Sequence, residues 1–148
     1  MKNCKKIITA SFLIAAGYAG LASAHTQSGS LIATPATDVY AVTCSNNGSG
    51  APAKLWFHVK DLAPKLAPLV SIQASKGGAS STLSTDPVDG DANYSPGVYL
   101  TPAVGAGVYT LKVNKSAGAG TETYTAEFHC QTSGGVHTGT TWRMTQNQ

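Results

Sequence analysis

Four histidines are present in the 148-residue chain, and imidazole nitrogen is a ligand that suits Cu(II). They are His25, His58, His129 and His137. If the chain is cut after Ala24, the ring of His25 lies beside a free α-amine, and these two nitrogens can chelate one copper ion. A second imidazole would complete a three-nitrogen site. The sequence therefore predicts copper binding by His25 with at least one of the other three histidines, which we keep as an alternative function.

The segment HCQTSGGVH contains two histidines on either side of a turn. A three-residue loop over 132–134 is a common hairpin connection, and it predicts that His129 lies opposite His137 with Cβ atoms about 5 Å apart. A two-residue turn would instead place them on opposite faces. Because His129 alternates with Phe128 and Cys130, we expect its ring to face solvent. An exposed polar position on a sheet is the simpler interpretation of each histidine taken singly.

The segment DPVDGDANY, residues 86–94, gathers oxygen-bearing side chains in one loop. Carboxylate and amide oxygens from one loop are the ligands that Ca²⁺ takes in proteins, although this segment lacks the EF-hand pattern. The alternative is an ordinary solvated turn, since Asp, Gly, Asn and Pro all favour turns. The predicted calcium ligands are Asp86, Asp89, Asp91 and Asn93.

The two tryptophans differ in their expected roles. Trp56 alternates outward beside His58, where it could form part of a contact surface for an unknown protein or carbohydrate partner. We expect Trp142 to be a core or edge residue. The motifs typical of serine hydrolases, zinc proteases and phosphate-binding loops are missing from the sequence, so we predict that the protein is not an enzyme.

The first 24 residues have the pattern of a cleaved secretory signal. Three lysines precede an apolar run that is too short to span a bilayer convincingly, and small residues end at Ala24. We therefore expect a secreted or periplasmic protein without a membrane span. The expected organisation is a signal peptide over 1–24, a flexible N-terminal arm over 25–37 and a β-sandwich domain over 38–148.

Removal of the signal changes the charge balance. The whole chain has ten Lys and Arg residues, seven Asp and Glu residues and a formal charge of +3. Three of the lysines lie in the signal, so the mature chain would hold seven residues of each sign and a formal charge of zero. The basic character of the precursor thus gives no support for a nucleic-acid partner.

The cysteine count also points to an oxidising compartment. Of three cysteines, Cys4 lies in the signal and leaves Cys44 and Cys130 in the mature chain. Two cysteines in an exported domain predict one disulfide. Cys44 shares its strand face with Tyr40, and Cys130 shares its face with Phe128, so both are expected to point toward apolar neighbours.

Short alternating segments separated by turn residues predict an all-β protein. Their number and spacing favour an antiparallel β-sandwich of about seven to eight strands, of jelly-roll or immunoglobulin-like type, with one disulfide. The expected strands are residues 38–44, 54–61, 68–75, 80–85, 97–102, 107–115, 121–131 and 138–146.

The segment GAGVYTLKVNKSAGAGTETYTAEFHC resembles the strand, Gly-rich turn and strand of bacterial pre-peptidase C-terminal domains and related jelly rolls. The resemblance covers about residues 38–131 and implies a small, exported, non-catalytic domain. Such domains accompany an enzyme, whereas this chain has no enzyme domain. The predicted N-terminus at His25 resembles those of lytic polysaccharide monooxygenases and some periplasmic copper carriers, which implies copper binding.

Three functions follow as hypotheses. The first is an exported non-catalytic β-sandwich that acts as a binding or surface module. The second is the copper protein described above. The third is an assembly subunit that self-associates, in which the arm over 25–37 adds a strand to a neighbouring sheet.

Overall fold

The structure, a computed structural model, describes residues 25–65, 68–100, 105–115 and 118–148. The predicted signal peptide lies outside the described residues. Within these ranges every regular element is a strand. The described residues contain no helix that is long and apolar enough to cross a membrane. The strands are β1 (His25–Leu31), β2 (Ala36–Ser45), β3 (Lys54–Leu62), β4 (Val70–Lys76), β5 (Ala79–Ser80), β6 (Ser84–Thr85), β7 (Val98–Tyr99), β8 (Gly107–Lys115), β9 (Glu122–Gln131) and β10 (Gly139–Gln146).

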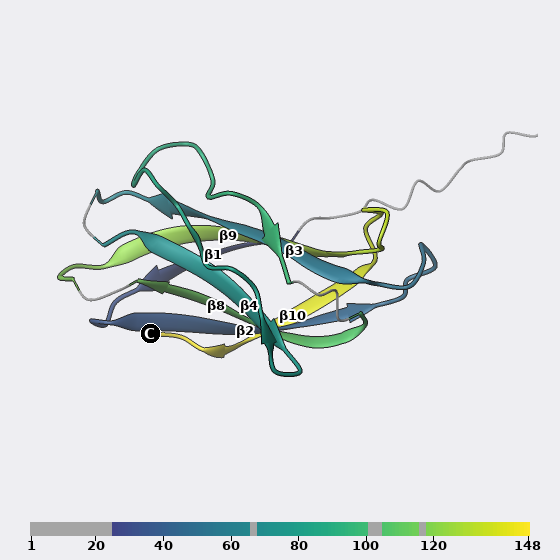
Figure 1. Cartoon of the computed structure of the whole chain (residues 1–148). Coiled ribbons are helices and arrows are strands. Elements are labelled where there is room, and N and C mark those ends of the chain that lie inside the picture. The colour runs from purple at the N-terminus through teal and green to yellow at the C-terminus, as the bar shows by residue number, and fades with distance from the viewer. Residues whose placement is uncertain (1–24, 66–67, 101–104, 116–117) are drawn as a thin grey trace, which may run out of the picture.

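The strands form two antiparallel sheets that pack face to face (Figure 1). Sheet A has the order β1-β9-β3-β7, and sheet B has the order β10-β2-β8-β4-β5 with β6 paired to β4. The all-β class and the antiparallel sandwich are therefore confirmed. Each of the eight expected strands corresponds to a strand of the structure, except that the segment over 80–85 contributes to two short strands, β5 and β6.

The core lies between the sheets and follows from the alternation of apolar residues. In β3, Leu55, Phe57 and Val59 are fully buried, while the residues between them face outward. In β9, Ala126 and Phe128 are buried in the same way. A strand with one apolar face gains roughly 25 cal/mol per Å² of apolar surface removed from water, which fixes the side that faces the other sheet.

The predicted disulfide is present and joins the two sheets. Cys44 of β2 bonds to Cys130 of β9, with a Cα–Cα distance of 5.5 Å and a sequence separation of 86. Both cysteines are buried in the core cluster. By the chain-entropy model a bridge over such a long loop stabilises the fold by about 4–5 kcal/mol. It is compatible with an extracellular or periplasmic location.

The segment predicted as a flexible arm instead contains an ordered edge strand. β1 pairs with β9 along its whole length, from His25 opposite Phe128 to Leu31 opposite Glu122, and Leu31 is fully buried. The inward positions of β1 include histidine, glutamine and glycine, so they do not show the apolar alternation that identifies a strand in sequence. An edge strand needs only one neighbour, and β9 supplies its hydrogen bonds.

A polar network crosses the core near this strand. The hydroxyl of Tyr124 donates to Asp38 at 2.7 Å and lies 2.5 Å from the hydroxyl of Tyr40. The backbone N–H of Gln148 donates to the other Asp38 carboxylate oxygen at 2.8 Å. Burial raises the pKa of Tyr124, so its hydroxyl keeps its proton. These contacts connect β2, β9 and the residues after β10.

Candidate functional site

A row of rings lies on the outer face of sheet A. Trp56 of β3 pairs opposite His129 of β9, and His58 of β3 pairs opposite Glu127. Cross-strand partners point to the same side of a sheet, and these residues alternate with the buried positions of their strands. The sequence-based expectation that Trp56 and His58 share the outer face is therefore confirmed. The expectation that the His129 ring faces solvent is wrong, because Trp56 and His137 cover it and it is only 7% exposed.

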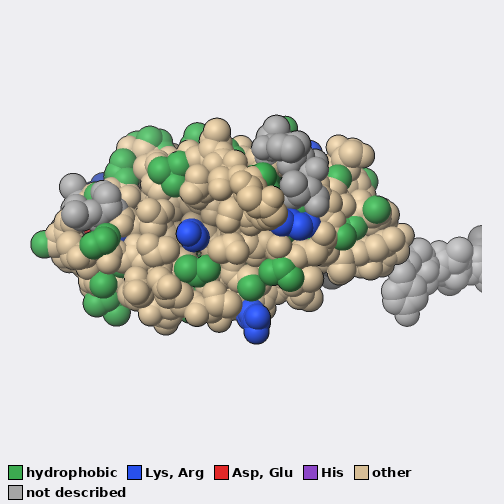
Figure 2. Space-filling view, turned by 60° about the horizontal axis from the view of Figure 1, so that its bottom comes forward, with side chains coloured by type: hydrophobic (Ala, Val, Ile, Leu, Met, Phe, Trp, Pro, Cys, Tyr) green, Lys and Arg blue, Asp and Glu red, His purple; other side chains and the backbone are tan. Residues whose placement is uncertain are grey.

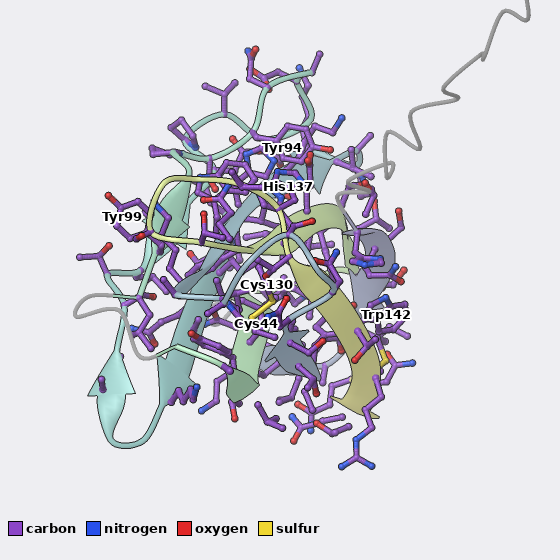
Figure 3. The ribbon with its side chains drawn as sticks, turned by 90° about the vertical axis from the view of Figure 1, so that its right-hand side faces the viewer. Cys44, Tyr94, Tyr99, Cys130, His137 and Trp142 are labelled. Atoms are coloured by element: carbon purple, nitrogen blue, oxygen red, sulfur yellow. A yellow bond between two sulfur atoms is a disulfide. The ribbon has the colours of Figure 1, made fainter. Side chains whose placement is uncertain are left out.

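Five rings form a continuous series in which three contacts are stacked and the contact between His58 and Trp56 is tilted by 55°. We call this series the ring row. Tyr94 stacks on His58 with ring centroids 3.9 Å apart and an interplanar angle of 9°. His58 and Trp56 lie 4.5 Å apart, and Trp56 stacks on His129 at 4.7 Å. His129 then stacks on His137 at 3.9 Å. In the end-on view of Figure 3, Tyr94 and His137 lie on the same side of the disulfide.

The register that brings His137 to the row differs from the predicted one. His137 pairs with Gln131, so the hairpin loop has five residues, 132–136, and His129 is not the direct partner of His137. Both loop lengths are odd, and the two histidines therefore stay on one face. The loop is closed by the N–H of Thr132, which donates to the carbonyl of Val136 at 2.8 Å.

Tyr94 reaches the row through the β6–β7 loop, residues 86–97, which follows the edge of β3. The N–H of Ser95 donates to the carbonyl of Val59 at 2.7 Å, and the Ser95 hydroxyl accepts from the Val59 N–H at 3.0 Å. Gly97 passes directly over Trp56, because a Cβ atom placed on it would lie 2.6 Å from the Trp56 ring. The loop is thus fixed on both sides of Tyr94.

Histidine electrostatics differ along the row. Burial, followed by the repulsion of His137, lowers the pKa of His129 to about 4, so its ring is neutral at pH 7. Gln131 donates to His129 Nε2 at 2.8 Å, whereas the Nδ1 atoms of His129 and His137 are buried without a hydrogen-bond partner. His58 Nε2 lies 3.1 Å from a carboxylate oxygen of Glu127.

Lysines and a tyrosine border the row. The ammonium of Lys60 lies 4.8 Å from the centre of the Tyr94 ring. Lys54 lies 4.5 Å from the centre of the Tyr99 ring. Tyr99 pairs opposite Trp56 and is 47% exposed, so it offers the most accessible ring on this face. We call the ring row with Lys54, Lys60 and Tyr99 the ring face.

The structure places His25 on the side of sheet A opposite to the ring row. It pairs opposite the buried Phe128, and the two rings lie 6.3 Å apart, so His25 belongs to the inner side of β1. Among the described residues, no group of three or more potential metal ligands includes a histidine. Copper binding through the mature N-terminus stays a prediction.

The predicted calcium ligands do not converge in one cluster. Both carboxylate oxygens of Asp86 accept backbone N–H groups, from Asp61 at 2.7 Å and from Val88 at 3.2 Å. Asp91 accepts two hydrogen bonds from Asn93. The hydrogen bond from the Asn93 backbone, followed by the one from the Asn93 side chain, lowers the pKa of Asp91. Of the four predicted residues, only Asp89 takes part in a group of converging carboxylates.

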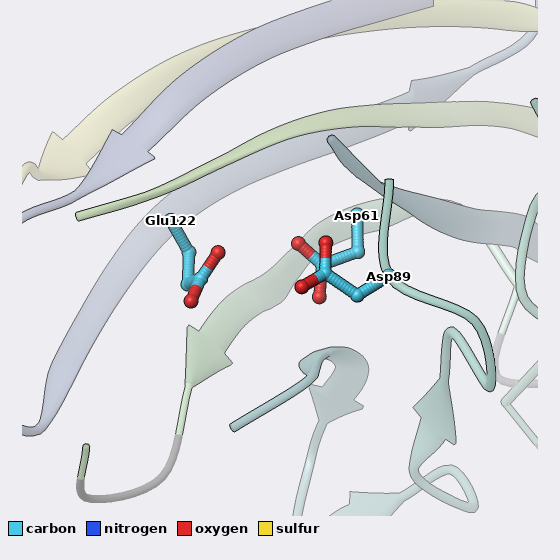
Figure 4. Close-up of side chains that lie close together, drawn as sticks. All are labelled: Asp61, Asp89 and Glu122. Atoms are coloured by element: carbon cyan, nitrogen blue, oxygen red, sulfur yellow. The ribbon is translucent and has the colours of Figure 1, made fainter. Parts of the chain in front are cut away.

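The partners of Asp89 are Asp61 and Glu122, which we had not predicted from the sequence (Figure 4). The alternation of buried residues in the sequence indicates the position of both acids. Asp61 continues the alternation of the buried residues of β3, and Glu122 begins the alternation of those of β9, so parity places both carboxylates on the inner face.

The outer face of sheet B offers less chemistry. Figure 2 shows separate Lys and Arg side chains there among scattered hydrophobic ones. A shallow hollow of about 290 Å³ contains one charged residue and no acid or histidine. Trp142 is a partly exposed edge residue, as expected, with its ring 5.8 Å from that of Tyr40. The hollow is lined by Ala41, Thr43, Val108, Thr141, Trp142 and Arg143.

Comparison of the chain with models of protein families, with curated proteins and with solved structures finds no match. The resemblance to pre-peptidase C-terminal domains therefore stays a prediction.

Proposed function

We propose that the protein is an exported, non-catalytic binding module and that the ring face is its contact surface. The observation that carries this proposal is the continuous series of five rings in contact, which come from three separate segments of the chain. Rings held by stacking and by the β-sheet lose little conformational entropy when a partner binds, so such a surface is preorganised for recognition. Tryptophan and tyrosine are also the residues that dominate binding energy at contact surfaces.

The distribution of side chains favours this face over the opposite one. The outer face of sheet A combines the ring row with the exposed Tyr99 and two lysines. Around the hollow of sheet B, threonine and small residues predominate. Aromatic side chains provide an apolar body with a polar tip, which gives the ring face both contact area and hydrogen-bonding groups.

The partner class that fits this face is an uncharged polysaccharide. The mature chain would have a formal charge of zero, so electrostatic attraction to a charged polymer has no support in its composition. Sugar rings have apolar faces that pack on aromatic rings and hydroxyl groups that bond to polar tips. Tyr99 and the edge of Trp56 offer both kinds of contact.

Sedimentation with insoluble polysaccharides such as chitin and cellulose tests the proposal. We expect the mature protein to bind at least one of them and Tyr99→Ala to weaken that binding about tenfold or more, since Tyr99 is exposed and its removal leaves the core intact. Arg143→Ala, on sheet B, is the matched control and should bind like the wild type. Loss of binding in Arg143→Ala but not in Tyr99→Ala would reject the ring face.

Copper binding is a second candidate, and the two Nδ1 atoms without partners favour it. In the structure Gln131 donates to Nε2 of His129, which places the ring hydrogen on Nδ1. A turned Gln131 amide would accept from Nε2 instead and leave the Nδ1 lone pair for a metal. Titration of the mature protein with Cu(II) tests this candidate, because His137→Ala should abolish binding by the pair and His25→Ala should abolish an N-terminal chelate.

A further inference from the structure

Three carboxylates from distant parts of the chain meet at one end of the sandwich. Asp61 lies near the end of β3, Glu122 begins β9, and Asp89 belongs to the β6–β7 loop. One oxygen atom of each lies within 4.8 Å of the others. Figure 4 shows the three side chains directed toward a common space between these segments. We call this group the acidic cluster.

Two of these carboxylates are buried where an apolar side chain is expected. Asp61 and Glu122 are both 0% exposed. Both carboxylate oxygens of Glu122, one oxygen of Asp61 and one oxygen of Asp89 have no hydrogen-bond partner. The second oxygen of Asp61 accepts from the N–H of Val70 at 2.8 Å. Burying a carboxylate is strongly unfavourable unless it is paired with a cationic group or coordinates a cation. These four oxygens therefore require a positive charge beside them.

The protein supplies little of that charge itself. Within the part of the chain that the structure describes, no basic nitrogen lies within 4.0 Å of an oxygen of the cluster. Lys115 is buried nearby on sheet B and lowers the pKa of Glu122, but burial and Asp89 raise it more. The Lys115 ammonium donates to the carbonyl of Gly120. The Lys115 ammonium therefore acts on Glu122 without forming an ion pair with it.

We infer that Asp61, Asp89 and Glu122 bind one hard divalent cation, and that Ca²⁺ is the cation that fits. The donors are carboxylate oxygens only, which Ca²⁺ prefers, whereas Zn²⁺ and Cu²⁺ favour nitrogen and sulfur ligands. Ca²⁺ binds oxygens at about 2.3–2.6 Å, so opposite ligands lie roughly 4.6–5.2 Å apart. The separations within the cluster are at most 4.8 Å, so they do not exceed this span. Mg²⁺ requires shorter bonds and near-ideal octahedral geometry.

Hydrogen bonds to β3 fix the position of the loop around Asp89. The carboxylate of Asp86 accepts the N–H of Asp61 at 2.7 Å, and the N–H of Gly90 donates to the carbonyl of Asp61 at 3.2 Å. These two contacts anchor the loop to β3 on either side of Asp89. A cation would add a third connection, through side chains, between the loop and the ends of β3 and β9.

This site is independent of the ring face, because no residue belongs to both, but the two share the β6–β7 loop. Asp89 lies five residues before Tyr94, which stacks on His58. Cation binding would therefore stiffen the segment that delivers Tyr94 to the ring row. A failure to bind polysaccharide would leave the cation site unaffected, and each can be tested alone.

Calorimetric titration of the mature protein with CaCl₂, after treatment with a chelator and desalting, tests the inference. We expect one ion to bind with a Kd of roughly 10⁻⁴ to 10⁻³ M, the range of extracellular calcium modules. Saturating Ca²⁺ should raise the Tm by about 5–10 °C. Asp89→Asn should weaken binding at least about tenfold, and because Asp89 is partly exposed this variant should still fold.

Asp91→Asn is the matched control, since it lies in the same loop outside the cluster and should keep wild-type affinity. Glu122→Gln removes a buried charge, so it should raise the Tm without Ca²⁺ and abolish the rise that Ca²⁺ causes. Absence of calcium binding to the wild type would overturn the inference and indicate that protons neutralise the cluster. Binding that Asp91→Asn abolishes, while Asp89→Asn does not, would also overturn it.

Discussion

Tyr94 lies on His58 with nearly parallel rings whose centroids are 3.9 Å apart, although 36 residues separate them in sequence. The β6–β7 loop makes this contact possible, because its Ser95 is hydrogen-bonded to β3 at Val59. The same loop carries Asp89 to the acidic cluster. One connection between the sheets thus serves both the proposed contact surface and the proposed cation site.

The buried histidine of the ring row predicts a pH dependence of stability. His129 has a folded-state pKa of about 4, against an ordinary value of 6.5. Between these values the unfolded chain binds more protons, so this stability is present above pH 6.5 and is lost as the pH falls toward 4. The difference between these two pKa values corresponds to about 3 kcal/mol. Four groups act on His129 besides burial, namely His137, Glu127, His58 and His25.

Chemical denaturation of the wild type and of His129→Gln from pH 4 to pH 7 measures this effect. The difference in unfolding free energy between the two proteins should be largest at pH 7 and should shrink toward pH 4. Comparing the two proteins cancels the titration of Asp61, whose pKa burial raises to about 7 and which acts in the opposite direction. A difference that stays constant with pH would mean that His129 does not lose its proton on folding.

Gly97 should be intolerant of a side chain because the loop passes over the Trp56 ring. In Gly97→Ala the new Cβ would lie 2.6 Å from Trp56, so the loop or the ring must move. We expect a loss of about 1–3 kcal/mol of unfolding free energy. Trp56 fluorescence should change as well, measured in a Trp142→Phe background where Trp56 is the remaining tryptophan. Gly134→Ala, in the exposed hairpin loop, is the control and should change neither the unfolding free energy nor the Trp56 fluorescence.

Gly29 tests whether β1 is docked as an edge strand. A Cβ on Gly29 would lie 2.4 Å from the Tyr124 hydroxyl, which the Asp38 carboxylate holds in place. Gly29→Ala should therefore cost about 1–3 kcal/mol in thermal or chemical unfolding. Ser28→Ala, on the outward side of the same strand, should change stability by less than about 0.5 kcal/mol. If Gly29→Ala and Ser28→Ala both change the unfolding free energy by the same small amount, residues 25–37 form a flexible arm instead.

Alternation along single strands could be read from the sequence, whereas contacts between strands could not. The faces of β3 and β9 and the pairing of Cys44 with Cys130 follow from parity and composition. The stacking of Tyr94 on His58 depends on a loop path that no local pattern specifies. His137 joined the row through a five-residue loop rather than the predicted three-residue one, because turn residues alone do not define the register.

Buried acids were missed for a different reason. The density of acids over residues 86–94 predicts a carboxylate cluster there, but two of the three acids in that segment form turn hydrogen bonds. Asp61 and Glu122 stand alone in sequence and continue apolar faces. An acid at a core position of a strand is therefore the more informative signal, since it requires a partner after folding.

A crystal structure of the mature protein grown in CaCl₂ would test the cation site most directly. The predicted result is one ion at the acidic cluster, with an oxygen of Asp61, Asp89 and Glu122 each at about 2.3–2.6 Å. The contradicting result is a cluster without an ion, in which the β6–β7 loop keeps the same path.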